Sequence, residues 1–148
     1  MCGINGIFAY GGAAAPIDTA ELTRTREHMA TRGPDGVGEW RSSDARVGFG
    51  HRRLAIIDPR PEGAQPMSTA DGRLWITFNG EIYNYEALRN ELLAQGVVFR
   101  SHSDTEVLLY LYARHGSDMV KRLRGMFAFA IWDKAERALF LARDPYGI

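Results

Sequence analysis

Short apolar runs alternate along the chain with longer segments whose apolar positions recur at helical spacing. The short runs are bounded by glycine, proline or aspartate, which favour turns, and so they predict strands. The longer segments are apolar on one face only, which predicts amphipathic helices. Strands are expected at 2–10, 37–41, 47–57, 73–78, 126–132 and 138–142, and helices at 18–32, 84–95 and 103–116.

The first helix carries signals for both of its ends. Asp18 stands at the N-cap position with Glu21 three residues later, which is the pattern of a capping box. Ile17 and Leu22 occupy the positions of a hydrophobic staple. The Gly-Pro pair at 33–34 is expected to end this helix after residue 32.

The two later helices also carry signals for their ends, and turn-forming residues mark the loop between the predicted strands. Ser103 and Glu106 repeat the capping pattern, and Gly116 is expected to close the helix that they open. Gly96 is expected to end the preceding helix. The segment 59–72 holds three prolines and two glycines, which predicts a surface loop.

The last two predicted strands, at 126–132 and 138–142, are apolar at successive positions. Strands of this kind must be covered on both faces, and a polar turn joins these two as a hairpin. Because the chain also holds three amphipathic helices, it is expected to form an α+β fold with helices packed outside stacked sheets.

Composition excludes several classes of function. The 148 residues correspond to one domain, and 18 basic against 18 acidic residues give a formal net charge of zero. No basic cluster points to a nucleic-acid partner. The first residues lack the pattern of a signal peptide, and no uncharged run is long enough to span a membrane. A single cysteine excludes an internal disulfide framework, so a reducing, cytoplasmic compartment is expected. The four histidines have no metal-ligand spacing, and no metal site is expected.

Cys2 is the only cysteine, and removal of Met1 would make it the N-terminal residue. A thiol nucleophile and a free amine would then share one residue. An unperturbed α-amine titrates near pH ~8, so part of it is neutral at cellular pH and can act as a base. An N-terminal amine is one of the bases that activate nucleophiles. The alternative is that Cys2 is a small buried side chain at the start of a strand.

Two adjacent arginines lie at 52 and 53, in the predicted strand 47–57. Successive strand residues face opposite sides of a sheet, so only one of the two can point inward. An inward guanidinium would clamp a small carboxylate through two hydrogen bonds. Two solvent-facing arginines of an edge strand are the alternative.

The Asn79-Gly80 pair also has two interpretations. Asn-Gly between two apolar runs is the strongest short-range signal for a hairpin. Alternatively, the Asn79 amide and the Gly80 N–H point at a developing oxyanion, since glycine lets a backbone donor come close to a ligand. The two interpretations are compatible. By themselves, the segments 103–106 and 32–36 are explained as a capped helix start and as a helix stop with a turn.

Taken in order, these clusters resemble the class II glutamine amidotransferase domain at the N-terminus of glutamine-dependent asparagine synthetases. The resemblance covers the whole chain, and the Arg-Gly-Pro-Asp-Gly form at 32–36 is typical of the asparagine synthetase branch. Thr31 stands where the family usually has histidine. The resemblance rests on the segments 1–4, 32–36, 50–58, 78–84, 103–106, 124–133 and 142–144.

The resemblance implies the four-layer αββα sandwich of N-terminal-nucleophile hydrolases, truncated at its C-terminal end because the family pattern continues beyond residue 148. It also implies that Cys2, freed of Met1, attacks the side-chain amide of L-glutamine and forms a γ-glutamyl thioester. Asn79 and Gly80 would hold the oxyanion.

The same resemblance implies how glutamine would be held. Arg53, which matches the family position, would clamp the α-carboxylate. Glu81 and Asp104 would receive the α-ammonium group, and backbone groups near Leu54 and Ile56 would contribute.

In the family, the ammonia passes to a C-terminal synthetase domain that uses ATP and magnesium to convert aspartate to asparagine. The phosphate-binding loop of that domain is absent from this sequence, so no ATP or magnesium site is expected here. A homodimer is compatible with this picture. Three alternatives stay open: a related amidotransferase with another carboxylate acceptor, a hydrolase that acts on a different amide, and a catalytically silent binding or regulatory domain.

Overall fold

A computed structural model describes residues 1–147 of the chain. In that range, no helix combines the length and hydropathy needed to cross a bilayer. The elements in order are β1 (Gly3–Phe8), α1 (Thr19–Glu27), β2 (Gly36–Arg41), β3 (Val47–Arg53), the 3-10 helix η1 (Pro61–Gly63), β4 (Met67–Ser68), β5 (Leu74–Ile82), α2 (Tyr85–Ala94), α3 (Asp104–His115), the 3-10 helix η2 (Gly116–Arg122), β6 (Gly125–Asp133) and β7 (Ala138–Arg143).

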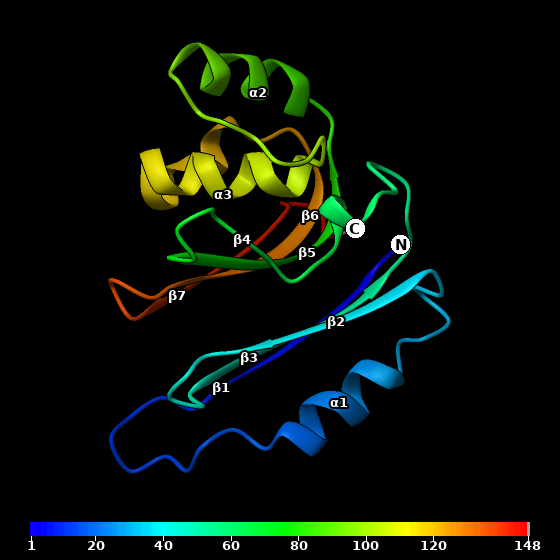
Figure 1. The fold of residues 1–148 in the computed structure, drawn as a ribbon, viewed down its shortest axis with the longest axis vertical. Helices are drawn as coiled ribbons and strands as arrows, with labels where there is room; N and C mark the ends of the chain where they lie inside the picture. The colour runs from blue at the N-terminus through cyan, green and yellow to red at the C-terminus, as the bar shows by residue number, and fades with distance from the viewer. Residues whose placement is uncertain (148) are drawn as a thin grey trace.

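Two antiparallel sheets are stacked face to face, with helices on their outer sides (Figure 1). The first sheet has the order β1-β3-β2 and carries α1 on its outer face, while the second has the order β4-β5-β6-β7 and carries α2 and α3. The expected four-layer αββα sandwich is confirmed. The N-terminus lies between the two sheets at one end of the layers (Figure 1).

Each sheet buries its outer face against its helices. Between the second sheet and its helices lies the larger core, in which α3 contributes Leu108, Leu109 and Leu111, all fully buried. At α1, Ile17 and Leu22 are buried as the staple predicts, and the Asp18 side chain accepts hydrogen bonds from two first-turn N–H groups. The apolar spacing of the helices therefore decides which face each one buries.

The inner faces of the two sheets meet in an aromatic cluster at one end. Phe49 and Trp132 are buried there, and Trp40 of β2 stacks on Trp75 of β5 with ring centroids 4.5 Å apart. These side chains connect the two sheets at that end.

The structure shortens two predicted elements. Helix α1 ends at Glu27 rather than at Arg32, because hydrogen bonds such as Met29 N–H to the Arg26 carbonyl (3.0 Å) tighten the chain into turns. Strand β3 ends at Arg53 rather than at residue 57, because the next N–H groups leave the sheet and bond to side chains, among them Ala55 to Asp35 (2.9 Å).

Two further predictions were wrong in part. The segment 59–72 is not a plain surface loop, because it contains η1 and the short strand β4, and Gly63 and Met67 are buried. At α3, Ser103 caps the helix as expected, but Glu106 accepts hydrogen bonds from the N–H groups of Arg100 (3.0 Å) and Ser101 (2.7 Å). Glu106 thus fixes the approach to the helix.

The hairpin interpretation of Asn79-Gly80 was also wrong. Both residues lie inside β5, where Asn79 pairs with Ala128 and Gly80 with Phe127 of β6. The local turn signal is overridden by pairing with a distant strand. β5 therefore continues to Ile82 instead of ending at Phe78.

Candidate active site

All the site residues that the sequence predicted line one small cavity of about 90 Å³ between the ends of the two sheets. The first sheet and the segment after it contribute one group, and the second sheet with the start of α3 contributes the other. The members predicted from sequence are Cys2, Arg53, Leu54, Ile56, Asn79, Gly80, Glu81 and Asp104.

Cys2 lies just before β1 and contacts the chain where β3 ends. Its Sγ is 3.4 Å from the Leu54 N–H nitrogen and 3.6 Å from the Leu54 carbonyl oxygen. Arg32 Nε donates to the Cys2 carbonyl at 3.2 Å. The thiol is half-buried, and Met1, 45% exposed, also lines the cavity. Removal of Met1 would therefore place the Cys2 amine at the cavity wall.

Arg52 and Arg53 diverge, as the alternation of a strand requires. Arg52 points to the outer face, where it reaches Glu27 at 3.4 Å. Arg53 lines the cavity, and its guanidinium donates to the Asp58 carbonyl at 2.5 Å and to the Arg60 carbonyl at 3.1 Å. Two backbone acceptors thus fix the plane of the guanidinium.

The turn that anchors Arg53 is itself tied to the second sheet's side of the molecule. Asp58, at a positive φ of 47°, forms two hydrogen bonds with the Arg60 guanidinium and accepts the His102 N–H at 2.7 Å. These bonds, with the Arg60 side chain first, hold the pKa of Asp58 far below its usual range. The Arg-Gly-Pro-Asp-Gly segment packs against the same strand end, where the Asp35 N–H bonds to the Arg53 carbonyl at 2.9 Å.

The second wall of the cavity is the free edge of β5. In an antiparallel ladder, successive N–H groups point alternately to the two sides of the strand. The Tyr83 N–H reaches the Arg124 carbonyl at 2.7 Å, on the β6 side. The N–H groups of Phe78, Gly80 and Ile82 therefore point the other way, where β4 pairs only as far as Ile76.

Side chains take the two outer N–H groups of this edge. Gln65 Oε1 accepts from Phe78 at 2.7 Å, and Asp104 Oδ2 accepts from Ile82 at 3.1 Å. The Gly80 N–H lies between them on the edge that borders the cavity. The cavity that Cys2 lines therefore also has a backbone N–H donor at its edge.

Gly80 has no room for a side chain. Its φ is +150°, and a Cβ would lie 2.2 Å from the Met126 carbonyl oxygen. Glycine is therefore needed to bring the strand this close to β6. Next to it, the buried Oδ1 of Asn79 has no hydrogen-bond partner among residues 1–147.

Two carboxylate residues line the cavity, one on each of two different elements. Asp104 begins α3 and is 3% exposed, whereas Glu81 follows Gly80 on β5 and is exposed. Burial, opposed by hydrogen bonds from Ile82 and Thr105 and aided by the charge of Glu81, raises the pKa of Asp104 to about 6. A cation bound between these two groups would stabilise the ionised form of Asp104.

Sequence reasoning missed several residues of the same cavity. Gln65 lies in the segment predicted as a surface loop, and no motif identified it. Ser103 and Thr105 were assigned only to the helix start. The cavity residues that were not predicted as site residues are Met1, Ile57, Gly63, Gln65, Phe78, Ser103, Thr105 and Met126.

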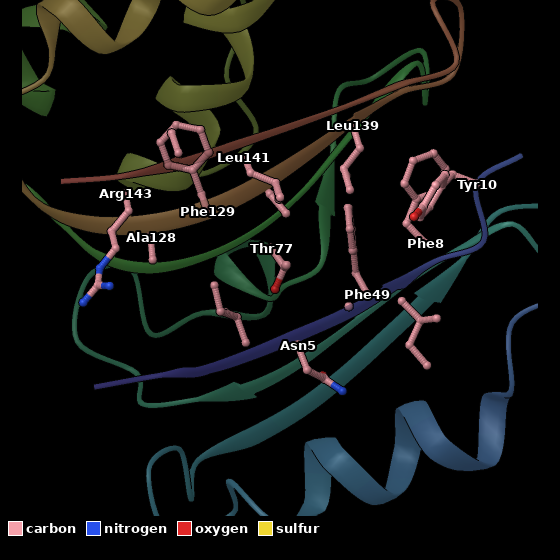
Figure 2. A pocket seen from close by; sticks show the side chains of 15 residues that line it. Asn5, Phe8, Tyr10, Phe49, Thr77, Ala128, Phe129, Leu139, Leu141 and Arg143 are labelled. Atoms are coloured by element: carbon pink, nitrogen blue, oxygen red, sulfur yellow. The ribbon is translucent and has the colours of Figure 1, made fainter. Parts of the chain in front are cut away.

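A larger cavity of about 700 Å³ lies between the sheets, and it does not contain Cys2 (Figure 2). Thr77, Leu139 and Leu141 point into it from the second sheet toward the first (Figure 2). Its lining is mostly apolar, and Arg143 is the one charged residue among the described residues that line it. Cavity size alone therefore does not identify the candidate site. No group of three potential metal ligands occurs among residues 1–147.

Comparison with known proteins identifies the class. A family model described as a glutamine amidotransferase domain matches residues 1–148, and the chain belongs to that family. The solved structure of glutamine phosphoribosylpyrophosphate amidotransferase from Bacillus subtilis, complexed with ADP and GMP, superposes with a TM-score of 0.74 at 24% identity. The match covers 97% of this chain and 37% of that chain, and it shows that the two proteins share this fold.

Two individual relatives match the whole chain. The chain is 49% identical over its whole length to asparagine synthetase [glutamine-hydrolyzing] 1 of Bacillus subtilis, of which it covers 23%. It is 38% identical to the amidase chry2 of Gibberella zeae, again over the whole chain and 23% of the relative. The chain thus spans about a quarter of the length of these relatives.

Proposed function

We propose that residues 1–148 form the glutaminase domain of a glutamine-hydrolysing asparagine synthetase. The observation that carries this proposal is the convergence of Cys2, Arg53, Asn79-Gly80 and Asp104 on one cavity from four separate parts of the chain. The 49% identity to the Bacillus subtilis asparagine synthetase supports the assignment to this branch.

In the proposed reaction, Cys2 Sγ attacks the side-chain amide carbon of glutamine after Met1 has been removed. The Cys2 α-amine accepts the thiol proton, and the carbonyl oxygen becomes an oxyanion held by the Asn79 amide and the Gly80 N–H. When the C–N bond breaks, the protonated amine returns the proton and ammonia leaves. Water then cleaves the γ-glutamyl thioester, releasing glutamate and restoring the thiol.

The charges of the cavity match those of a free amino acid. Arg53 would bind the α-carboxylate with its fork, whose orientation the two carbonyls of the 58–60 turn already fix. Asp104 and Glu81 would bind the α-ammonium group. Backbone groups at Leu54 and Ile56 complete the wall beside Cys2. This pattern favours a zwitterionic amide over a neutral one.

The proposal also includes a destination for the ammonia. In it, the released ammonia reaches a C-terminal synthetase domain, in which ATP and magnesium activate aspartate. The second candidate function is ammonia transfer to a different carboxylate acceptor. It is supported by the match of the whole chain to a relative that is named as an amidase. A homodimer belongs to the proposal as well, and sedimentation equilibrium of the natural protein tests it.

Ammonia and glutamate release from L-glutamine by the complete natural protein tests the proposal, with Cys2→Ala as the matched variant. We expect turnover in the wild type and a loss of at least about a thousandfold in the variant, because Cys2 is the only thiol in the sequence. Intact mass should show that Met1 is absent. Formation of asparagine with added ATP and aspartate would support the acceptor.

Other outcomes separate the alternatives. Glutamate without asparagine would leave the glutaminase in place and favour another acceptor. Turnover of a simple amide at the rate of glutamine would favour a hydrolase with different specificity. No turnover by protein that has lost Met1 would favour a silent binding domain.

A further inference from the structure

We propose that Gln65 is a positioning residue for the oxyanion hole, although it donates nothing to the substrate itself. This inference rests on the proposed function, since it concerns how the Asn79-Gly80 segment is held. Gln65 is half-buried, lines the cavity and lies between η1 and β4. Its side chain accepts a backbone hydrogen bond from β5 that a neighbouring strand would otherwise accept.

The register of β4 shows why a side chain is needed at this point. Met67 pairs with Ile76, so Gln65 stands opposite Phe78 in the continued antiparallel register. However, the backbone carbonyl of Gln65 faces Gly38 of β2, where an added Cβ would lie 1.8 Å from it. The main chain at Gln65 therefore packs against the first sheet and does not extend the ladder.

The Gln65 side chain supplies the missing acceptor. Oε1 accepts the Phe78 N–H at 2.7 Å, a short distance for such a bond. At its other end, Nε2 donates to Thr105 Oγ1 at 3.2 Å, and Thr105 is 2% exposed in the first turn of α3. A single amide thus ties the strand residue before Asn79 to the helix that carries Asp104.

The consequence is that the Gly80 N–H is held from both sides. Gln65 fixes the Phe78 end of the free edge, and Asp104 fixes the Ile82 end. Without Gln65, the Phe78 N–H loses its acceptor, and the peptides between Phe78 and Gly80 can rotate. Because oxyanion donors act only in a narrow geometry, a small rotation weakens them while leaving the groups for the α-carboxylate and α-ammonium in place.

Gln65→Met tests this role in the complete natural protein, because methionine keeps the length of the side chain and removes both amide atoms. We expect kcat for glutamine to fall about 10- to 100-fold, with KM for glutamine and Ki for glutamate within about threefold of wild type. Glutamate binds through its α-groups but has no tetrahedral step, so its Ki reports the clamp alone. Gln95→Met, at the exposed C-cap of α2, is the matched control and should behave as wild type.

Thr105→Val provides a second and milder variant if Gln65→Met fails to fold. It removes only the hydroxyl that holds the far end of the Gln65 amide, and kcat should fall by an intermediate factor at constant KM. Unchanged kcat in either folded variant, or equal changes in kcat and in glutamate Ki, would overturn the positioning role. An inactive wild type that has lost Met1 would instead overturn the proposed function, so the two failures are distinguishable.

Discussion

The two halves of β5 use one strand in opposite ways. The half from Leu74 to Thr77 lies between β4 and β6, so its backbone groups have strand partners on both sides up to Ile76. The half from Phe78 to Ile82 has β6 on one side only. The candidate active site borders this second half. The candidate site therefore forms where β5 has no neighbouring strand on one side. There, side chains accept hydrogen bonds from only some of the free backbone N–H groups.

The two halves of β5 also differ in the polarity of the residues around them. Trp75, in the doubly paired half, packs in the aromatic cluster that joins the sheets. Glu81, in the singly paired half, lines the small cavity together with Arg53 and Cys2. One half therefore contributes stability through apolar contact, and the other keeps polar groups available to a ligand.

Gly80→Ala should have the largest effect on the singly paired half of β5. The added Cβ would lie 2.2 Å from the Met126 carbonyl oxygen at a φ of +150°, so strand and partner must separate. We expect a loss of about 3 kcal/mol or more in the free energy of unfolding and of at least about a hundredfold in kcat/KM. Urea denaturation and ammonia release measure the two effects.

Gly72→Ala is the control for this change, beside the doubly paired half. Gly72 has a φ of +67° but open space around it, so only the backbone strain of about 1 kcal/mol is expected, with normal activity. Equal losses in the two variants would show that positive φ, rather than the close approach to β6, decides the effect.

The sandwich could be predicted because its signals are local. The apolar spacing and the caps at Asp18 and Ser103 lie within a few residues of the elements they define, and the structure confirms both caps. The divergence of Arg52 and Arg53 follows from strand alternation alone. The remaining site residues were predicted from the family motifs, which required no knowledge of the three-dimensional structure.

The wrong predictions depend on contacts that lie outside the short sequence patterns from which they were made. Asn79-Gly80 has a hairpin signal, but pairing with residues 127 and 128 keeps it in a strand. Glu106 has the spacing of a capping box, yet it binds N–H groups at 100 and 101. Gln65 has no sequence signal at all, because its role depends on how β4 ends and on which way its own carbonyl turns.

Asp104→Asn tests the anchor at the Ile82 end of the free edge. Burial raises the pKa of Asp104 from 3.8 to about 6, so the folded state binds this proton more tightly than the unfolded chain does. The resulting stabilisation is complete below pH ~4 and is lost as pH rises through about 6. Asparagine keeps an oxygen for the Ile82 N–H but has no proton to lose. Between pH 4 and 7, wild type should therefore lose roughly 2 kcal/mol relative to the variant.

Urea denaturation of both proteins at several pH values gives this difference directly. A constant difference across the range would mean that Asp104 is ionised throughout and that its burial is offset by its hydrogen bonds. Glutamine turnover by the variant should fall as well, because one of the two groups proposed for the α-ammonium is lost.

Arg53→Lys tests the proposed carboxylate clamp on the cavity wall that the end of β3 forms. Lysine keeps the charge but loses the planar fork and the two bonds to the 58–60 carbonyls. We expect KM for glutamine to rise about 10- to 100-fold, with a smaller change in kcat, corresponding to roughly 2 kcal/mol of binding. Arg52→Lys, on the outer face beside Glu27, is the control and should leave KM unchanged. An unchanged KM in Arg53→Lys would remove the carboxylate clamp from the mechanism.

The smallest effect belongs to the doubly paired half. Trp40 and Trp75 stack with centroids 4.5 Å apart and planes 16° apart, which joins β2 of the first sheet to β5 of the second. A double-mutant cycle with Trp40→Leu and Trp75→Leu should give a coupling of about 1 kcal/mol in the free energy of unfolding. The kcat of Trp75→Leu should stay within about twofold of wild type, because kcat depends on groups held at the other half of the strand. A large fall in kcat with little loss of stability would mean that the two halves of β5 are mechanically coupled. The separation of stability and chemistry along this strand would then be wrong.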